Sequence, residues 1–274
     1  MTPDIPLHLL VQRSIALLIA NAPKDGSPYF GCFSGGKDSI CIKELARLAR
    51  VPVVWHYHMT TIDPPELLRF IRKHHPDVAW DKPRHGNMFR RIERKGLPTR
   101  FRRWCCDEYK EIAGPKGCTK VVGVRIAEST RRAARYTQCV MSAPAGRHDV
   151  LPIRLWSDAH VWQFIRAKEL PYCSLYDEGF TRLGCIGCPL PGGNSRAIEF
   201  ARWPGYAKQW RLAALRFYKR RASYRKPDGS EWGVCKMFTS GEELWDWWLS
   251  ALPYRKWCEQ RKQQEFALES EGRF

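Results

Sequence analysis

The stretch FGCFSGGKDS, residues 30–39, decides the fold. Residues 28–34 predict a strand, and residues 38–50 predict a helix from their helical spacing of apolar residues. Three small residues lie between the two elements: Ser34, Gly35 and Gly36. Such residues let the backbone approach an anion, and the N-terminus of the following helix adds the positive end of its dipole. The stretch therefore predicts a phosphate-binding loop, with an ordinary strand-to-helix turn as the alternative.

The pattern continues outward from this loop. Further strands are predicted at residues 51–59, 77–83, 119–126 and 149–156, with helices between them and a helix at 157–170. Alternation of strands and helices predicts an α/β fold: a parallel, Rossmann-like sheet with right-handed crossovers and helices on both faces. Ligands of such sheets bind at the carboxyl ends of the strands, where the loop lies.

The character of the chain changes near residue 195, where basic, helical sequence begins. We therefore expect a nucleotide-binding domain over residues 1–195 and a helical basic extension over residues 196–274. No internal repeat marks either part.

Charge and composition limit the classes of partner that we expect for the protein. The chain has 274 residues, 44% of them hydrophobic, and a formal net charge of +18. No apolar run is long enough for a bilayer, and the N-terminus lacks the pattern of a signal peptide, so no membrane partner and a cytoplasmic location are expected. The positive charge favours nucleic acid, and the alternative is a solvated basic surface around a small anionic substrate.

The loop is more specific than a glycine pair. A Walker motif needs Ser or Thr where Asp38 stands, so this is a different loop. The hexapeptide resembles the PP-loop, S-G-G-x-D-S, of the adenine-nucleotide α-hydrolase superfamily, which includes ATP pyrophosphatases and the sulfonucleotide reductases of APS and PAPS. The resemblance implies nucleotide binding by Ser34, Gly35, Gly36, Lys37, Asp38 and Ser39.

Eleven cysteines without a secretory signal favour metal or redox chemistry over disulfides. Two pairs stand out, Cys105 with Cys106 and Cys185 with Cys188, and four thiolates suit zinc or an iron–sulfur cluster. A Cys-Cys pair followed far downstream by C-x-x-C resembles the four-iron, four-sulfur signature of APS reductases and other PAPS-reductase-family proteins, the DNA phosphorothioation enzymes among them. The resemblance implies one 4Fe-4S cluster on these four residues; the alternative is that some are buried packing residues.

Two further segments resemble the same family, which brings the resemblance to residues 28–190. GVRIAESTRRAAR (123–135) is similar to its G-x-R-x-x-E-S-x-x-R segment, and residues 170–189 are similar to its segment ending in C-x-x-C-P. Arg125 and Arg132 are expected to contact phosphate or sulfate, and Glu128 to orient an arginine. His58, at the end of the second strand, is expected near the nucleotide; capping of the sheet edge is the alternative.

Two further features bear on which activity of this family the chain has. Reductases of this family carry a catalytic cysteine in a C-terminal E-C-G-L-H segment, which is absent here. Basic runs at residues 89–106 and 216–226 are interleaved with aromatic residues, a mixture that suits nucleic acid.

The leading hypothesis is an ATP-using sulfur-transfer enzyme that acts on DNA or tRNA, with Mg²⁺ and with protein partners supplying sulfur or electrons. Its expected catalytic residues are Lys37, Asp38, Arg125 and Arg132. The second hypothesis is an APS or PAPS reductase in which Cys235 or Cys258 replaces the missing nucleophile. The third is a non-catalytic, nucleotide-sensing subunit that binds nucleic acid.

Overall fold

The computed structural model describes residues 5–110, 114–191 and 194–271 of the chain. It divides into two compact units. The first unit consists of Met1–Met59, Asp63–Pro83 and Tyr109–Gly184. The second consists of Thr60–Ile62, Arg84–Glu108 and Cys185–Phe274. The predicted division into domains at residue 195 stays a prediction, because compactness does not show which part folds by itself.

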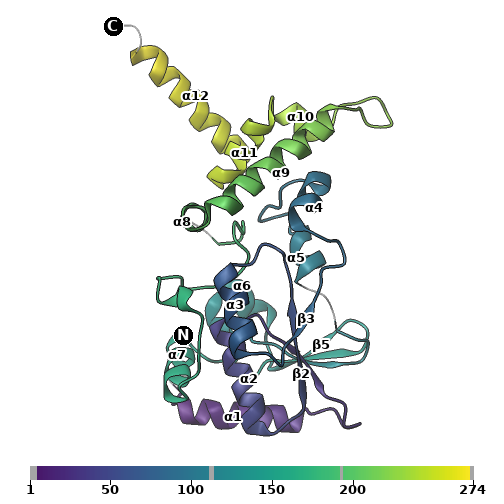
Figure 1. Ribbon diagram of the computed structural model, residues 1–274, viewed down its shortest axis with the longest axis vertical. Coiled ribbons are helices and arrows are strands. Elements are labelled where there is room, and N and C mark those ends of the chain that lie inside the picture. Colours follow the sequence, from purple (N-terminus) through teal and green to yellow (C-terminus); the bar gives the residue numbers. More distant parts are fainter. Residues whose placement is uncertain (1–4, 111–113, 192–193, 272–274) are drawn as a thin grey trace. The chain divides into compact units, whose positions relative to one another are not determined.

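A six-stranded sheet forms the centre of the first unit (Figure 1). In chain order its strands are β1 (Tyr29–Cys32), β2 (Val53–His58), β3 (Ala79–Asp81), β4 (Thr119–Val121), β5 (Val140–Ala143) and β6 (Arg147–Val150). Their spatial order is β3-β2-β1-β4-β6-β5, and every neighbouring pair is parallel except β5 with β6. The predicted α/β fold with a mostly parallel sheet is confirmed.

Helices surround this sheet. They are α1 (Leu7–Ala20), α2 (Lys37–Ala49), α3 (Pro65–His74), α6 (Thr130–Arg135) and α7 (Asp158–Ala167), with short 3₁₀ turns η1 (Ile126–Glu128) and η2 (Ser174–Tyr176). Helix α2 packs against α1 and α7. Its inner face contributes the fully buried Ile42 and Leu45, and each such side chain stabilises the fold by about 1.5–3 kcal/mol. The loop before α2 is therefore built on a rigid base.

The antiparallel edge strand β5 differs from the sequence-based expectation. Its sequence, VMSA, carries little strand signal, and the predicted strand at 149–156 is in fact β6, which ends at Val150. The pair is a hairpin closed by Ala145 and Gly146, both with positive φ. A glycine in such a short loop is the signal that predicts a hairpin.

The second unit is helical within the described residues. Its elements are α4 (Met88–Lys95), most of α5 (Trp104–Tyr109), α8 (Ser195–Arg202), α9 (Pro204–Ala222), α10 (Gly233–Met237), α11 (Gly241–Ser250) and α12 (Tyr254–Glu271). Helix α9 packs along both α4 and α11 (Figure 1). Tryptophans fill the core, and Trp210 stacks on Trp248 with ring centroids 4.8 Å apart. No helix of the described chain is long and apolar enough to cross a membrane.

Candidate functional site

The loop at residues 34–39 joins β1 to α2 at the carboxyl edge of the sheet. Gly35 has φ +73°, and a Cβ atom there would lie 2.7 Å from side-chain carbons of Leu67 and Ile71. The backbone N–H of Lys37 donates to the Tyr176 hydroxyl at 2.9 Å. The loop is therefore a close turn before a 13-residue helix, whose N-terminal dipole favours an anion.

The two serines of the loop are linked to each other and to its backbone, with Ser39 buried and Ser34 exposed. The Ser39 hydroxyl donates to the carbonyl oxygen of Gly36 at 2.8 Å, and Ser34 Oγ lies 3.3 Å from Ser39 Oγ. Ser34 Oγ also accepts from the Gly36 N–H at 3.4 Å. These hydrogen bonds fix the shape of the turn, so the sequence-predicted phosphate residues 34–39 are gathered into one small structure.

The side chain of Lys37 is buried, with only 5% of the residue exposed. Its ammonium lies 3.3 Å from Asp158 Oδ1 and donates to the carbonyl oxygen of Thr181 at 3.1 Å. The charge is thus compensated by the protein itself. Contact with a phosphate would require the ammonium to exchange these partners for the ligand.

Arg125 is part of the same network. Its Nε donates to Asp38 Oδ1 at 2.6 Å, and its Nη2 donates to Asp158 Oδ1 at 3.1 Å. The arginine is 3% exposed. The guanidinium of Arg125 therefore contacts both carboxylates and orients Asp38. Asp158 was absent from the sequence-based site; its signal was its position at the start of a helix that follows the carboxyl end of a strand.

Arg132 is more accessible to solvent than Lys37 and Arg125. Glu128 accepts a hydrogen bond from Arg132 Nη1, which is the orienting contact expected between these residues, and 34% of the Arg132 side chain is exposed. Burial lowers the pKa of Arg132, and the positive charge of Arg182 lowers it further. Because two cations in range repel each other, a bound oxyanion would stabilise both. Arg182 was also missed, although it stands inside the family-like segment 170–189.

His58 lies at the carboxyl end of β2. Its Nδ1 is 2.9 Å from Asp81 Oδ2, and His56 Nδ1 is 3.1 Å from the same oxygen. Burial lowers the pKa of His58, which keeps the ring neutral at pH 7. Asp81 therefore forms a hydrogen bond with His56 and lies close to His58, and the expected nucleotide contact of His58 stays a prediction.

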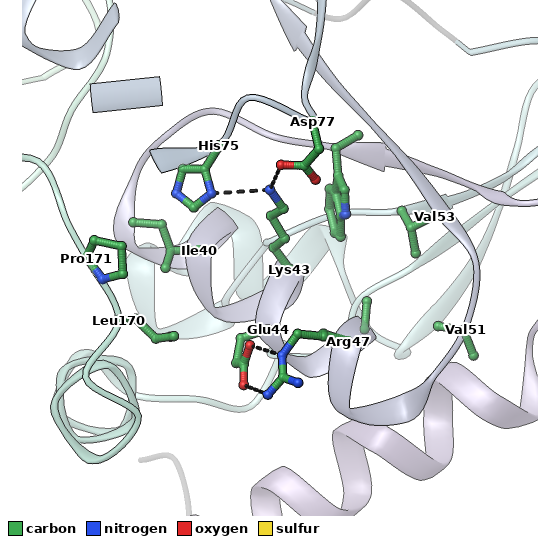
Figure 2. A pocket seen from close by; sticks show the side chains of 12 residues that line it. Ile40, Lys43, Glu44, Arg47, Val51, Val53, His75, Asp77, Leu170 and Pro171 are labelled. Atoms are coloured by element: carbon green, nitrogen blue, oxygen red, sulfur yellow. Dashed lines mark hydrogen bonds and ion pairs between the residues drawn. The ribbon is translucent and has the colours of Figure 1, made fainter. Parts of the chain in front are cut away.

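A cavity of about 340 Å³ lies elsewhere in the first unit, and residues 34–39 do not line it (Figure 2). Within it the Lys43 ammonium lies between Asp77 Oδ1 at 2.6 Å and His75 Nδ1 at 3.2 Å. Burial, with a contribution from Lys43, lowers the pKa of His75 to about 4. The cavity lies beside α2, carries a partly exposed ion pair, and is not lined by the phosphate loop.

All four cysteines of the expected cluster belong to the second unit. A hydrogen bond with Cys106 and burial raise the pKa of the Cys105 thiol, and interactions with Cys185 and Cys188 raise it further. Cys105 is thus within electrostatic range of the other three thiols. Among the residues with described positions, however, no three His, Cys, Asp or Glu side chains are arranged to hold a metal ion. The donor chemistry suits an iron–sulfur cluster, and the thiols would have to converge to bind it.

The C-x-x-C turn is built with supporting contacts. Gly187 has φ +77°, and a Cβ atom there would lie 2.7 Å from Trp210 Nε1. The Gly187 N–H donates to Glu199 Oε2 at 2.6 Å, and Trp210 Nε1 donates to the Ile186 carbonyl at 3.0 Å. Helices α8 and α9 therefore hold the turn that carries Cys185 and Cys188.

Cys235 and Cys258 are the candidate replacements for the missing nucleophile of a reductase. Burial raises the pKa of the Cys235 thiol, and Glu231 raises it further. A raised pKa lowers the thiolate fraction at neutral pH, so this environment does not favour Cys235 as a nucleophile. Burial raises the pKa of Tyr254, and a hydrogen bond with Cys258, one helical turn away on α12, raises it further.

The two basic runs, far apart in sequence, meet on the second unit. Helix α4 carries part of the first run and α9 part of the second, and the two helices pack side by side (Figure 1). Arg221 Nη2 donates to the carbonyl oxygen of Arg94 at 3.0 Å, and Arg216 Nη1 lies 2.9 Å from Glu93 Oε1. The unit that holds the four cysteines therefore also concentrates basic side chains.

Comparison with known proteins places these observations in context. An uncharacterized protein of Methanocaldococcus jannaschii is 30% identical over 191 residues, which are 65% of this chain and 39% of that protein. Adenosine 5'-phosphosulfate reductase of Staphylococcus epidermidis is 37% identical over 59 residues, 22% of this chain and 24% of that enzyme. The chain thus spans well under half the length of either relative.

A solved structure and a family model complete the comparison. The phosphoadenylyl-sulfate reductase of Candida auris, in a phosphate complex, has a TM-score of 0.49 at 15% identity, covering 68% of this chain and 98% of that one. Residues 28–191 match the family model of the phosphoadenosine phosphosulfate reductase domain. Because that match covers more than half of the chain, the protein belongs to the phosphoadenosine phosphosulfate reductase domain family.

Proposed function

We propose that the protein is an ATP-dependent sulfur-transfer enzyme that acts on nucleic acid. One observation carries the proposal: the helical unit that holds Cys105, Cys106, Cys185 and Cys188 also holds both basic runs. Candidate sulfur chemistry and a candidate polyanion surface therefore belong to one compact body. A reductase of a small sulfonucleotide needs no such surface.

The first reaction step would be activation of the acceptor by ATP. An acceptor oxygen forms a bond to the α-phosphorus, the bond from that phosphorus to its bridging oxygen breaks, and pyrophosphate leaves with the electron pair. Residues 34–39 would hold the phosphates. Arg132 and Arg182 would stabilise the charge that develops on the phosphate oxygens, while Arg125 keeps Asp38 in place.

A metal ion and an iron–sulfur cluster belong to this proposal. Mg²⁺ would neutralise phosphate oxygens beside Asp38, whose carboxylate suits that ion. A 4Fe-4S cluster on these cysteines would hold inorganic sulfur for transfer at an iron that releases its thiolate ligand. A sulfur donor, delivered by a partner protein, then replaces the activated oxygen, and AMP leaves.

A second candidate function is reduction of APS or PAPS. The similarity to adenosine 5'-phosphosulfate reductase over 59 residues favours it. It requires a thiolate that attacks sulfur, and the environment of Cys235 does not favour one. Replacement of Cys235 and Cys258 by serine therefore separates the two candidates, because only the reductase loses activity.

Equilibrium binding of ATP, APS and PAPS to anaerobically purified protein, at fixed Mg²⁺, tests the proposal. We expect ATP to bind most tightly, and we expect Asp38→Asn to weaken it. Tighter binding of APS or PAPS would contradict the proposal and support the reductase. ATP binding with no turnover in the presence of DNA or tRNA would instead indicate a nucleotide-sensing subunit.

A further inference from the structure

A single aromatic side chain projects from the second unit between α4 and α5. Phe101 is 99% exposed, which is the largest value among the exposed hydrophobic residues of the described chain. Its neighbours Arg100 and Arg102 are also exposed, and neither is paired with a carboxylate within the described residues. An isolated exposed apolar residue is common on protein surfaces, so exposure alone assigns no role.

The turn that carries Phe101 is well anchored. The Thr99 N–H donates to the Arg102 carbonyl at 3.1 Å, and the Arg102 N–H donates back to Thr99 Oγ1 at 3.0 Å. Just before the turn, the carbonyl oxygen of the buried Pro98 accepts from Trp248 Nε1 at 2.6 Å. The phenyl ring therefore projects from a fixed turn, so its exposure is a property of the fold.

Charge around the turn indicates the partner. Residues 84–103 contain eight arginines and lysines and a single acidic residue, Glu93. Glu93 is already paired with Arg216 of α9, and Arg91 and Lys95 are paired with Glu108. The exposed arginines of this stretch are Arg84, Arg90, Arg94, Arg100 and Arg102. An excess of exposed guanidinium groups around a projecting ring suits a polyanion that also offers flat, apolar faces. Nucleic acid has both features.

We propose that Phe101 stacks on an unpaired base, while Arg100 and Arg102 contact the phosphates on either side. A ring on a short turn cannot reach bases inside a duplex, because they are stacked on each other, so the partner is single-stranded or locally unpaired nucleic acid. This inference rests on the proposed function and narrows its acceptor. Phe101 is a binding residue of this surface.

The position of the turn relates this contact to the candidate cluster. Phe101 precedes Cys105 by four residues, and four residues span at most about 14 Å between Cα atoms. A base stacked on Phe101 is therefore near the helix that carries Cys105 and Cys106. The surface would thus bring an acceptor nucleotide to the unit that holds the sulfur chemistry.

The test is fluorescence anisotropy with a labelled single strand and with its duplex, in the absence of ATP. We expect Phe101→Ala to weaken single-strand binding by about 5- to 100-fold, with little change for the duplex, and Phe101→Trp to restore it. Leu249→Ala, on another exposed apolar residue of this unit, is the matched control and should have no effect. Because Phe101 is fully exposed, its replacement should leave the melting temperature unchanged.

Two outcomes would overturn the inference: single-strand binding by Phe101→Ala equal to the parent protein, or an equal loss for single strand and duplex. Replacing Arg100 and Arg102 with Gln should reduce the slope of log affinity against log salt by about 0.7 for each lost phosphate contact. These measurements need neither ATP turnover nor sulfur. A failure of the proposed ATP chemistry therefore leaves them interpretable, and their failure leaves the ATP chemistry standing.

Discussion

At the residue scale, Gly35 fixes the geometry of the phosphate loop. An alanine there must adopt φ +73° and place its Cβ 2.7 Å from carbons of Leu67 and Ile71. We expect Gly35→Ala to lower the free energy of unfolding by about 2–5 kcal/mol, from backbone strain and overpacking together, and to weaken ATP binding. Urea denaturation and nucleotide titration measure the two effects.

Gly26 provides the matched control for this substitution. It has φ +77°, but a Cβ atom there has no neighbour within 4 Å. Gly26→Ala should therefore lower the free energy of unfolding only through backbone strain, by about 1–2 kcal/mol, and leave ATP binding unchanged. If the two variants lose equal stability, close packing against the loop does not constrain Gly35.

Arg132 is one of the arginines of the site that we expect to contact nucleotide. Its guanidinium is oriented by Glu128 and lies in range of Arg182, so a bound oxyanion would relieve their repulsion. We expect Arg132→Ala to weaken ATP binding by about 10- to 100-fold, the loss of one hydrogen bond to a charged group. Isothermal titration calorimetry measures it.

Its neighbour Arg131 is exposed and supplies the control. Arg131→Ala should change ATP affinity by less than about fivefold, because a solvated charge contributes little. Equal losses in both variants would show that general positive charge, and not Arg132 itself, attracts the nucleotide.

The residue types of the nucleotide site followed from its motifs, but their pairings did not. Lys37 and Arg125 are expected to contact phosphate, and in the structure both also contact Asp158. That partner lies more than 100 residues from the loop, so no local pattern indicates it. The contact between Glu128 and Arg132, four residues apart on one short segment, is the kind that a sequence does predict.

At the element scale, we expect the contact between α8 and the C-x-x-C turn to support metal binding by the four cysteines. Glu199 of α8 accepts the Gly187 N–H at 2.6 Å and so holds the turn between Cys185 and Cys188. We expect Glu199→Ala to reduce metal affinity by about 10- to 100-fold, as lost supporting hydrogen bonds usually do. Iron and sulfide analysis of anaerobic protein, with visible absorbance, provides the measurement.

Glu242 of the same unit is paired with Arg211 on the surface and gives a control. Glu242→Ala should retain the iron content of the parent protein. A colourless parent protein, prepared without oxygen, would contradict the cluster itself. Equal iron in all three proteins would instead show that the turn needs no support from α8.

The cavity beside α2 predicts a pH dependence of stability. The ordinary pKa of histidine is about 6.5, whereas that of His75 is lowered to about 4. The unfolded chain therefore binds a proton in this window while the folded chain does not, so the free energy of unfolding falls as the pH decreases from 6.5 toward 4. Above pH 6.5 this loss of unfolding free energy does not occur.

Denaturation of the parent protein and of His75→Gln at pH 7.5 and pH 5 measures this effect. The parent should lose more stability than the variant between the two values, because the variant has no proton to take up at this site. An equal loss would show that His75 titrates alike in the folded and unfolded chain.

Most strands of the sheet were visible in the sequence from their apolar runs and from the turn residues that bound them. The exception, β5, lies at the sheet edge with half-buried residues and pairs only with β6. An edge strand needs no apolar run, so its formation depends on the hairpin and on tertiary pairing.

At the scale of the whole molecule, the sequence indicated two basic runs and two cysteine pairs without showing which would meet. The first basic run and Cys105 and Cys106 stand in the middle of the chain, in a segment expected to be part of the nucleotide-binding domain. In the structure, residues 84–108 belong to the helical unit. Long-range packing of α4 on α9 decides this, and no local pattern encodes it.

The most direct test of the account follows the fate of ATP labelled at the α- and γ-phosphates, with anaerobic protein, Mg²⁺ and a sulfur donor. The account predicts that adding nucleic acid, above all single-stranded nucleic acid, produces equal amounts of AMP and pyrophosphate and that Asp38→Asn abolishes both. Release of sulfite from APS or PAPS, with no cleavage of ATP at the α-phosphate, would contradict the account.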